Sequence, residues 1–197
     1  TTVAATMIIA DLAGIKIFAT GGIGGVHKFA EKTFDISADL QELAKTGISV
    51  VCSGPKAILD IPKTLEFLET LGVPVITFGQ TYLPAFWSSD SPFISPLSLN
   101  DPCLIAKSHE IRKELGLSGG QLIANPISKK DQIPFEKMEP IIMDAVKSAN
   151  EQNIIAKELT PFVLSRINEL TKGKSLSANI ALIKNNAKLA SQIALCF

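Results

Sequence analysis

The sequence is poor in several features that would point to particular classes of protein. Its 197 residues include three cysteines, one tryptophan and one tyrosine, and 19 basic residues balance 19 acidic ones. Because there is neither a surplus of positive charge nor a basic stretch interleaved with aromatics, we expect no nucleic-acid partner. No apolar run approaches the roughly 18 residues that would suggest a membrane span, so we expect no membrane insertion.

The three cysteines, Cys52, Cys103 and Cys196, lie far apart in the sequence. An odd number with no CxxC pair argues against a disulfide framework and against a zinc site. We therefore predict a reducing compartment, most simply the cytoplasm, with an organelle left open. The chain starts at Thr1 rather than at a methionine, so we expect it to be one part of a longer protein.

Hydrophobic patterning predicts helices that alternate with four short buried strands. The strands are expected at residues 15–19, 48–52, 75–78 and 121–124, and the helices at about 1–14, 37–44, 56–72, 101–115, 135–150, 160–173 and 177–197. This alternation is typical of a single α/β domain over residues 1–197, with a mostly parallel sheet and helices on both faces. We expect the terminal helices, from Pro134 onward, to pack on the sheet, and residues 79–100 to form a long surface loop.

Two loops follow the first two predicted strands. The first is Thr20–Gly25 (TGGIGG), and the second is Ser53–Lys56 (SGPK). Ligands of parallel α/β sheets bind beyond the carboxyl ends of the strands, so we expect both loops to border one site. The glycines permit close backbone approach, but they match neither GxGxxG nor a P-loop, so no nucleotide cofactor is expected. A phosphate or sugar site and a purely structural tight loop both remain open.

Lys56 follows Gly-Pro directly, on a constrained backbone. If it is partly buried beside another cation, its pKa falls and the neutral amine can attack a carbonyl group. From the pattern alone, an ordinary exposed lysine in the first turn of a helix is the simpler explanation.

Two acids flank a serine in the segment Phe34–Leu40 (FDISADL). Ser37 is a predicted helix cap, and Asp39 in the first turn is explained by the helix dipole alone. Alternatively, a phosphate binds at Ser37, and Asp35 holds a cation that offsets the repulsion between acid and phosphate. A lone aspartate with waters and substrate oxygens suits Mg²⁺ or Mn²⁺ rather than zinc.

The remaining polar candidates lie after the glycines and on the last predicted helix. His27 is suited to hydrogen-bond a ligand or shuttle a proton, or simply to satisfy the backbone. Asn179 and Asn186 are seven residues apart and share a helix face, which indicates either a polar role or a solvated stripe. His109 and Cys52 are predicted to be structural.

Four segments carry a resemblance to a known family: GGIGGVH (21–27), DISADL (35–40), SGPK (53–56) and SANIALIKNNAKLA (177–190). Taken together and in this order, they resemble the pseudouridine-5′-phosphate glycosidases, also called the indigoidine synthase A-like family. The resemblance spans essentially all of the chain.

The resemblance implies a homotrimeric α/β enzyme with Mn²⁺ at its site. It implies reversible cleavage of the C–C glycosidic bond of pseudouridine 5′-phosphate to uracil and ribose 5-phosphate. The residues implied are the nucleophile Lys56, the metal-binding Asp35, the phosphate- and substrate-binding Ser37, Ala38 and Asp39, the substrate contacts Thr2 and Val3, the base-assisting Asn179, and His27 of the GGVH motif. We expect Lys56 to form an imine with ring-opened ribose, and Asp39 to orient water or shuttle protons.

The resemblance also implies a departure. Family members carry a preceding segment with a glutamate acid/base and a second lysine, and neither residue has a counterpart here. Loss of such an acid/base costs on the order of 10²–10⁴-fold in rate. We therefore expect the chain alone to be an incomplete catalyst, which is either one piece of a cleaved enzyme or one part of a longer chain.

Three alternative functions stay open at this point. One is another Schiff-base lyase, such as an aldolase acting on a sugar phosphate, which would keep Lys56 but need no pyrimidine pocket. The second is a non-catalytic fragment that serves as the scaffold for its missing part. The third is a metal-dependent phosphohydrolase that uses Asp35 and Asp39 and is indifferent to Lys56.

Overall fold

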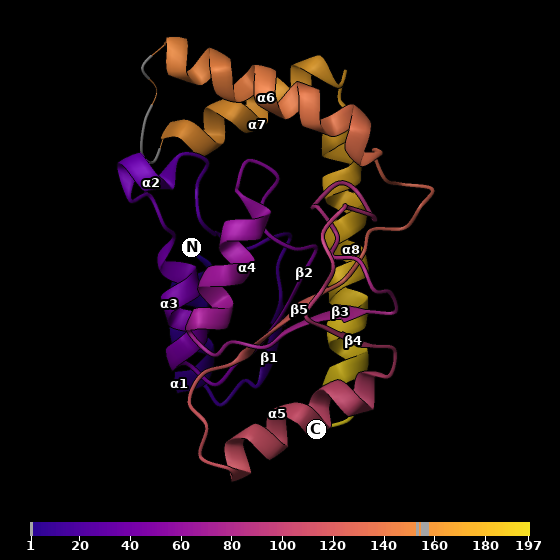
Figure 1. Cartoon of the computed structure of the whole chain (residues 1–197). Coiled ribbons are helices and arrows are strands. Elements are labelled where there is room, and N and C mark those ends of the chain that lie inside the picture. Colours follow the sequence, from indigo (N-terminus) through magenta and orange to yellow (C-terminus); the bar gives the residue numbers. More distant parts are fainter. Residues whose placement is uncertain (1, 153, 155–157) are drawn as a thin grey trace.

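A computed structural model describes residues 2–152, 154 and 158–197. A five-stranded sheet with the order β1-β2-β5-β3-β4 lies at its centre, and every strand pair is parallel (Figure 1). The strands are β1 (Ile17–Ala19), β2 (Ser49–Cys52), β3 (Val75–Phe78), β4 (Leu97–Leu99) and β5 (Gln121–Ala124). The predicted parallel α/β sheet is confirmed, and β4 is an additional strand that the pattern did not reveal.

Helices cover both faces of the sheet, because successive strand residues point to opposite sides. On one face, Val50 and Leu122 pack with α1 (Val3–Leu12), α3 (Ala38–Lys45) and α4 (Ile61–Thr70). On the other face, Val51 and Ile123 pack with α5 (Pro102–Glu114) and α8 (Lys174–Ala194). Burial on both faces explains why the strands read as continuous apolar runs.

The C-terminal helices divide between two places. α8 runs along the sheet, as predicted, whereas α6 (Phe135–Glu151) and α7 (Leu159–Leu170) lie across one end of the molecule (Figure 1). There they pack with Ile58, Phe86 and Trp87, which belong to loops beyond the carboxyl ends of the strands. The prediction of a helical layer on the sheet thus holds for α8, while α6 and α7 cover the loops that border the candidate site.

The prediction of a surface loop at residues 79–100 was wrong. Leu83 is fully buried, Trp87 is 1% exposed, and Leu97–Leu99 pairs with β3. Hydroxyl groups of the segment are bonded within the fold; for example, Ser91 Oγ donates to the Leu83 carbonyl at 2.6 Å. The surrounding serines and prolines concealed a short apolar run, LPAFW, that serves as core.

The predicted helix starts are partly confirmed. The Thr2 hydroxyl accepts from Ala5 N–H and caps α1, and Ser37 caps α3 as expected. The helix predicted from Lys56 begins only at Ile61, because Asp60 is its cap and Pro62 lies in its first turn. Asp101 caps α5, α8 begins three residues before Ser177, and a short helix, α2 (Ala30–Thr33), was not predicted.

The interpretation of the cysteines was also wrong in one respect. Cys103 and Cys196 form a disulfide that ties the start of α5 to the end of the chain, with a Cα–Cα distance of 5.1 Å. The sequence separation of 93 hid the pair, which the packing of α5 on α8 brings together. The disulfide removes the reason for expecting a reducing compartment. Cys52 is buried as predicted, and burial raises the pKa of its thiol to about 12.

Among the helices of the described residues, none is both long and apolar enough to cross a membrane.

Candidate active site

The glycine loop (Thr20–Gly25) and the lysine loop (Ser53–Lys56) lie side by side beyond β1 and β2. Ile23 forms a parallel bridge with Pro55, and Lys56 N–H donates to the Ile23 carbonyl at 3.0 Å. Four residues further along, His27 pairs with Leu59 in an antiparallel bridge. The structure thus brings together the two strand-end segments that the sequence placed at one edge.

A third segment, residues 35–37, runs along the other side of the glycine loop. Ser37 N–H donates to the Gly25 carbonyl, and His27 N–H donates to the Asp35 carbonyl, each at 3.0 Å. The candidate nucleophile, histidine, metal ligand and phosphate-binding serine therefore come from three adjacent backbone segments.

His27 lies between two charges of opposite sign. Its Nδ1 atom is 3.8 Å from Asp35 Oδ2. Burial lowers the pKa of His27, and the nearby Lys56 charge lowers it too, while Asp35 raises it. Since burial is the largest effect, His27 is neutral at pH 7 and can accept a proton. Its interaction with Lys56 shows that the half-buried lysine and the histidine lie within electrostatic reach of each other.

Gly24 and Ser37 approach each other too closely for any side chain at position 24. A Cβ atom on Gly24 would lie 2.1 Å from Ser37 Oγ and 2.8 Å from Asp39 Oδ2. The glycine requirement therefore comes from the contact with Ser37 and α3. It keeps the Ser37 hydroxyl, the start of α3 and the glycine-loop amides at one point.

The Asp39 carboxylate links α1, the glycine loop and α3. Its Oδ2 accepts from Gly24 N–H and its Oδ1 from Ala4 N–H, both at 2.8 Å, and the residue is 5% exposed. The carboxylate thereby ties the start of α1 to the glycine loop and α3. Thr2 and Val3 are brought to the same place, but the Val3 side chain is buried in the core, which leaves Thr2 as the polar group there.

Two aromatic residues, Trp87 and Phe86, link Asn179 to the glycine loop. Asn179 Oδ1 accepts from Trp87 Nε1 at 2.6 Å, and Trp87 stacks edge-on against Phe86 with ring centroids 4.9 Å apart. The Phe86 ring in turn touches the glycine loop, since a Cβ on Gly22 would lie 2.7 Å from it. Sequence reasoning missed the role of Trp87, and the signal that could have revealed it was the LPAFW run.

Asn186 lies on the same helix face as Asn179 but is not part of a solvated stripe. It is fully buried, and its amide contacts groups at the ends of three strands. His109 and Cys52 are buried, as predicted, and Cys52 Sγ accepts from Gly54 N–H at 3.3 Å at the base of the lysine loop.

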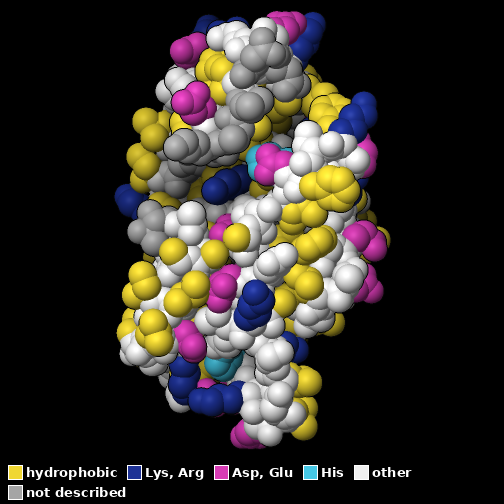
Figure 2. Space-filling model, turned by 90° about the vertical axis from the view of Figure 1, so that its left-hand side faces the viewer, with side chains coloured by type: hydrophobic (Ala, Val, Ile, Leu, Met, Phe, Trp, Pro, Cys, Tyr) yellow, Lys and Arg dark blue, Asp and Glu magenta, His cyan; other side chains and the backbone are white. Residues whose placement is uncertain are grey.

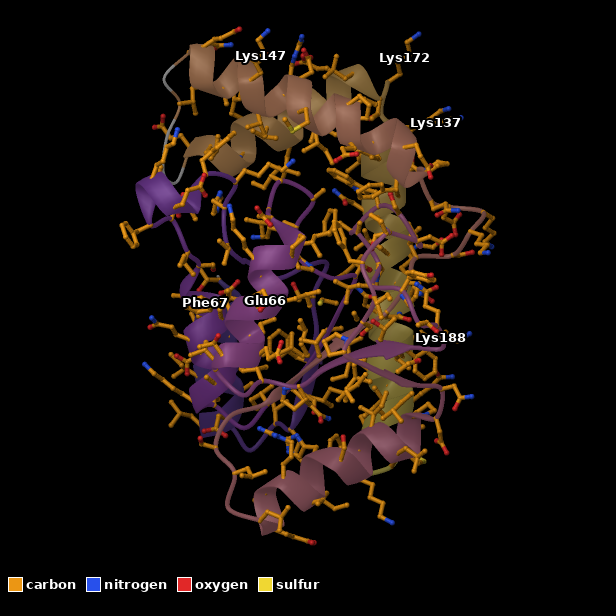
Figure 3. The ribbon with its side chains drawn as sticks, in the orientation of Figure 1. Glu66, Phe67, Lys137, Lys147, Lys172 and Lys188 are labelled. Carbon is orange, nitrogen blue, oxygen red and sulfur yellow. A yellow bond between two sulfur atoms is a disulfide. The ribbon has the colours of Figure 1, made fainter. Side chains whose placement is uncertain are left out.

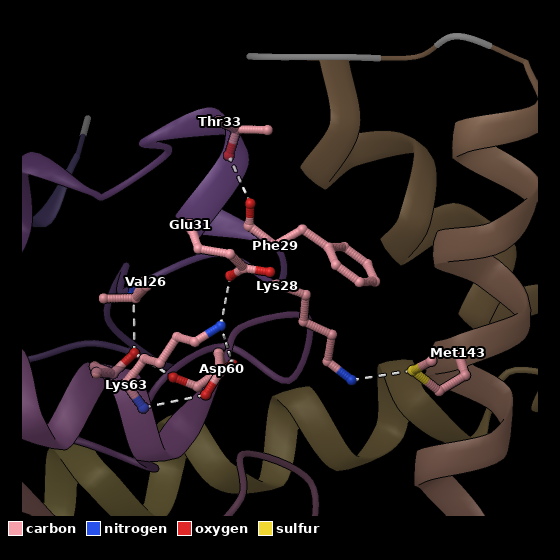
Figure 4. Close-up of polar contacts among 9 residues, drawn as sticks. Val26, Lys28, Phe29, Glu31, Thr33, Asp60, Lys63 and Met143 are labelled. Carbon is pink, nitrogen blue, oxygen red and sulfur yellow. Dashed lines mark hydrogen bonds and ion pairs between the residues drawn. The ribbon is translucent and has the colours of Figure 1, made fainter.

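Ion pairs brace the outer side of the site (Figure 4). Lys63 Nζ lies 2.7 Å from a Glu31 carboxylate oxygen and 3.2 Å from one of Asp60, which ties α2 to the start of α4. Lys28 Nζ reaches towards α6, 3.1 Å from Met143 Sδ. The segments that follow His27 and Lys56 are thus held to each other and to the covering helix.

The described residues contain no group of three or more histidine, cysteine or acidic side chains suited to hold a metal ion. Asp35 is a single carboxylate whose side chain is 48% exposed, beside a neutral imidazole. This donor set fits a hard divalent cation that keeps most of its waters, and it does not fit a zinc site.

These features define a parallel α/β protein whose polar site lies at the carboxyl edge of the sheet, against one half-buried lysine. Residues 1–196 match the family model described as Indigoidine synthase A like protein, and the chain belongs to this family.

Curated relatives and solved structures agree with this assignment. The chain is 63% identical over 194 residues to the pseudouridine-5′-phosphate glycosidase of Paracoccus denitrificans (strain Pd 1222), covering 98% of this chain and 64% of the relative. It is 60% identical over 194 residues to that of Roseobacter denitrificans, covering 98% and 63%.

Two solved structures share the fold. The prealnumycin C-glycosynthase AlnA in complex with ribulose 5-phosphate is 33% identical, with a TM-score of 0.93, covering 100% of this chain and 65% of that one. An indigoidine synthase A-like protein from Thermotoga maritima MSB8 is 35% identical, with a TM-score of 0.89, covering 98% and 63%. The chain thus spans slightly less than two thirds of the length of the proteins it matches.

Proposed function

We propose that this chain carries the imine-forming and phosphate-binding part of a pseudouridine-5′-phosphate glycosidase. The observation that carries the proposal is the placement of Lys56. Its backbone is fixed against the glycine loop, its charge is near enough to lower the pKa of His27, and Ser37 caps a helix beside the same loop. Curated relatives of that name at 63% and 60% identity support the same activity.

The chemistry suits an amine nucleophile. Lys56 Nζ bonds to C1′ of the ribose while the C1′–O4′ bond breaks and O4′ takes up a proton. The nitrogen lone pair then forms an imine as the bond from C1′ to the base breaks, and C5 of the departing uracil is protonated. Water hydrolyses the imine to ribose 5-phosphate and regenerates the amine. The lysine nitrogen supplies the electron pair that expels the base and holds C1′ as an imine, which is needed because a C-nucleoside offers no leaving-group nitrogen.

The phosphate has a suitable place at the start of α3. The Ser37 hydroxyl, the Ala38 amide and the positive end of the helix dipole would bind it. Thr2 lies at the same place because Asp39 ties α1 to this point. Both carboxylate oxygens of Asp39 already accept backbone hydrogen bonds. We therefore assign Asp39 a positioning role rather than a role in proton transfer.

The remaining groups take supporting roles. Neutral His27 would accept and return the proton of the Lys56 amine, and Asn179, oriented by Trp87, would hydrogen-bond the uracil. Asp35 would hold Mn²⁺, which supplies Lewis-acid stabilisation of oxygen charge when bound. Assembly as a homotrimer, and completion by a segment on a separate chain, belong to the same proposal.

Turnover tests the proposal. The chain is incubated with pseudouridine 5′-phosphate and Mn²⁺ together with the segment that precedes the matched part of the Paracoccus denitrificans relative, supplied as a separate chain. Uracil is measured by chromatography, with the full-length relative as positive control. We expect uracil and ribose 5-phosphate in equal amounts, and [¹⁴C]uracil incorporation in the reverse direction. Release of inorganic phosphate without uracil would favour a phosphohydrolase. Sugar-phosphate cleavage without uracil exchange would favour an aldolase.

A further inference from the structure

Asn186 makes a set of contacts that the proposed mechanism does not use. Its Nδ2 donates to the Thr20 carbonyl at 2.8 Å, and its Oδ1 accepts from Asn125 Nδ2 at 3.1 Å. The Ser53 hydroxyl lies 3.1 Å from Nδ2 and 3.3 Å from Oδ1. One amide from α8 therefore joins the carboxyl ends of β1, β2 and β5.

These contacts lead directly to the nucleophile. Ser53 N–H donates to the Gly21 carbonyl at 2.9 Å, so the residues that Asn186 binds are also bound to each other. Two residues beyond Gly21, the Ile23 carbonyl accepts from Lys56 N–H. The amide of Asn186 therefore adds a side-chain link at the base of the glycine and lysine loops, which backbone hydrogen bonds also join.

Helix stability does not explain the residue. Asparagine is a poor helix former, and a fully buried amide is costly unless its donors and acceptors are paired. In this case all its partners lie at strand ends, where the sheet's own hydrogen bonding stops. The neighbouring Asn185 makes one such bond, from Nδ2 to the Pro126 carbonyl at 2.9 Å, and touches neither loop.

We propose that Asn186 is a positioning residue that holds the Lys56 loop against the glycine loop and thereby sets the reactivity of Lys56. This rests on the proposed function, because reactivity here means formation of the imine at Lys56. The claim that Asn186 holds the two loops together rests on its hydrogen bonds alone and can be tested separately.

The first arm of the test is native hydrogen exchange on the whole chain and on three variants: Asn186→Ala, Ser53→Ala and the control Asn185→Ala. We expect Asn186→Ala to speed exchange at residues 20–25 and 54–57 by about tenfold or more, with α5 and β3 unchanged. Ser53→Ala removes only the hydroxyl contact and should act at the same residues, more weakly. Asn185→Ala should leave both loops unchanged.

The second arm measures trapping of ribose 5-phosphate with borohydride as a function of sugar concentration, well below each variant's melting temperature. A misplacement of about 1 Å can cost on the order of 10²-fold in rate. We expect Asn186→Ala to lower the maximal trapping rate by about 10–100-fold. The half-saturating concentration should change less than threefold, because the Ser37 site is untouched.

The outcomes separate the two proposals. If the parent chain does not trap sugar, the proposed imine formation at Lys56 is refuted. The hydrogen-exchange measurement still decides whether Asn186 holds the two loops together. Uniform acceleration of exchange across the chain, or an unchanged trapping rate in Asn186→Ala, would overturn the positioning role. If Asn186→Ala does not fold, Ser53→Ala decides: no local change in either arm would overturn it.

Discussion

The two ends of the same parallel sheet carry similar polar residues that are arranged differently. Beyond the carboxyl ends, Asp39 and Asn186 are buried and bonded to backbone, whereas Lys56 is half-buried and its charge lowers the pKa of His27. Beyond the amino ends, the second histidine, His109, is locked in a closed network. In Figure 2 the two histidines lie in opposite halves of the molecule, one beside acidic and one among basic side chains.

The amino end shows what a structural polar cluster looks like. His109 Nδ1 lies 3.0 Å from Ser49 Oγ, which accepts from Gln121 Nε2 at 3.1 Å. A cavity of about 460 Å³ opens there, lined by Lys16, Arg112 and Lys113 among others. Because α1, α3 and α5 all end at this side, their dipoles explain the basic residues without a ligand. A hollow with charged walls is therefore not sufficient evidence for a site.

The largest expected effect on stability belongs to the disulfide between the start of α5 and the end of the chain. The Cys103–Cys196 disulfide closes a long loop, and removing such a bond typically costs about 2–5 kcal/mol. We expect dithiothreitol to lower the melting temperature of the parent chain but not that of Cys103→Ser. Sugar trapping at Lys56 should be unaffected in the folded variant. A loss of trapping would contradict the independence of the Lys56 site from the disulfide.

Asp39→Asn tests whether the Asp39 carboxylate stabilises the carboxyl end of the sheet by joining α1 to the glycine loop. One backbone N–H would then face an amide N–H instead of a carboxylate oxygen, at a cost of about 1.5–3 kcal/mol. Urea unfolding measures the change, with Asp11→Asn on the exposed side of α1 as control. Equal stability of the two variants would contradict a stabilising role of the Asp39 carboxylate.

A glycine pair compares the two ends with the same substitution. At Gly24 an added methyl group meets Ser37 and Asp39, so Gly24→Ala should cost about 1–3 kcal/mol and weaken phosphate binding. At Gly47, near the amino end, a Cβ meets nothing within 4 Å. Gly47→Ala should be neutral or gain up to about 1 kcal/mol. Thermal unfolding and phosphate titration check both, and a neutral Gly24→Ala would contradict the close approach.

The smallest effect is the pH dependence of stability. Burial lowers the pKa of both His27 and His109 below 6.5 in the folded chain. The unfolded chain therefore binds protons first, so stability is complete above pH 6.5 and falls as the pH drops through the folded-state pKa values. Urea unfolding at pH 7.5, 6.5 and 5.5 should show this slope, reduced in His27→Gln and in His109→Asn. An unchanged slope in both variants would assign it to other groups.

The sequence predicted the parts of the fold that depend on local patterning. Four strands, the Ser37 cap and the placement of both loops at one sheet edge follow from apolar runs, cap residues and the geometry of parallel sheets. The disulfide and the buried Trp87 depend on packing between segments far apart in the chain, and no local pattern encodes that. For the same reason, the spacing of Asn179 and Asn186 showed a shared face but not that Asn186 is fully buried.

Borohydride trapping with ribose 5-phosphate addresses the role of Lys56 most directly. The chain is compared with Lys56→Ala and with Lys188→Ala, whose lysine is exposed on α8 like those on α6 in Figure 3. We predict an adduct with the mass of the sugar phosphate less water plus two hydrogens, mapping to Lys56. It should be present in the parent and in Lys188→Ala and reduced at least 10³-fold in Lys56→Ala. An adduct of undiminished yield in Lys56→Ala would contradict the assignment of the nucleophile.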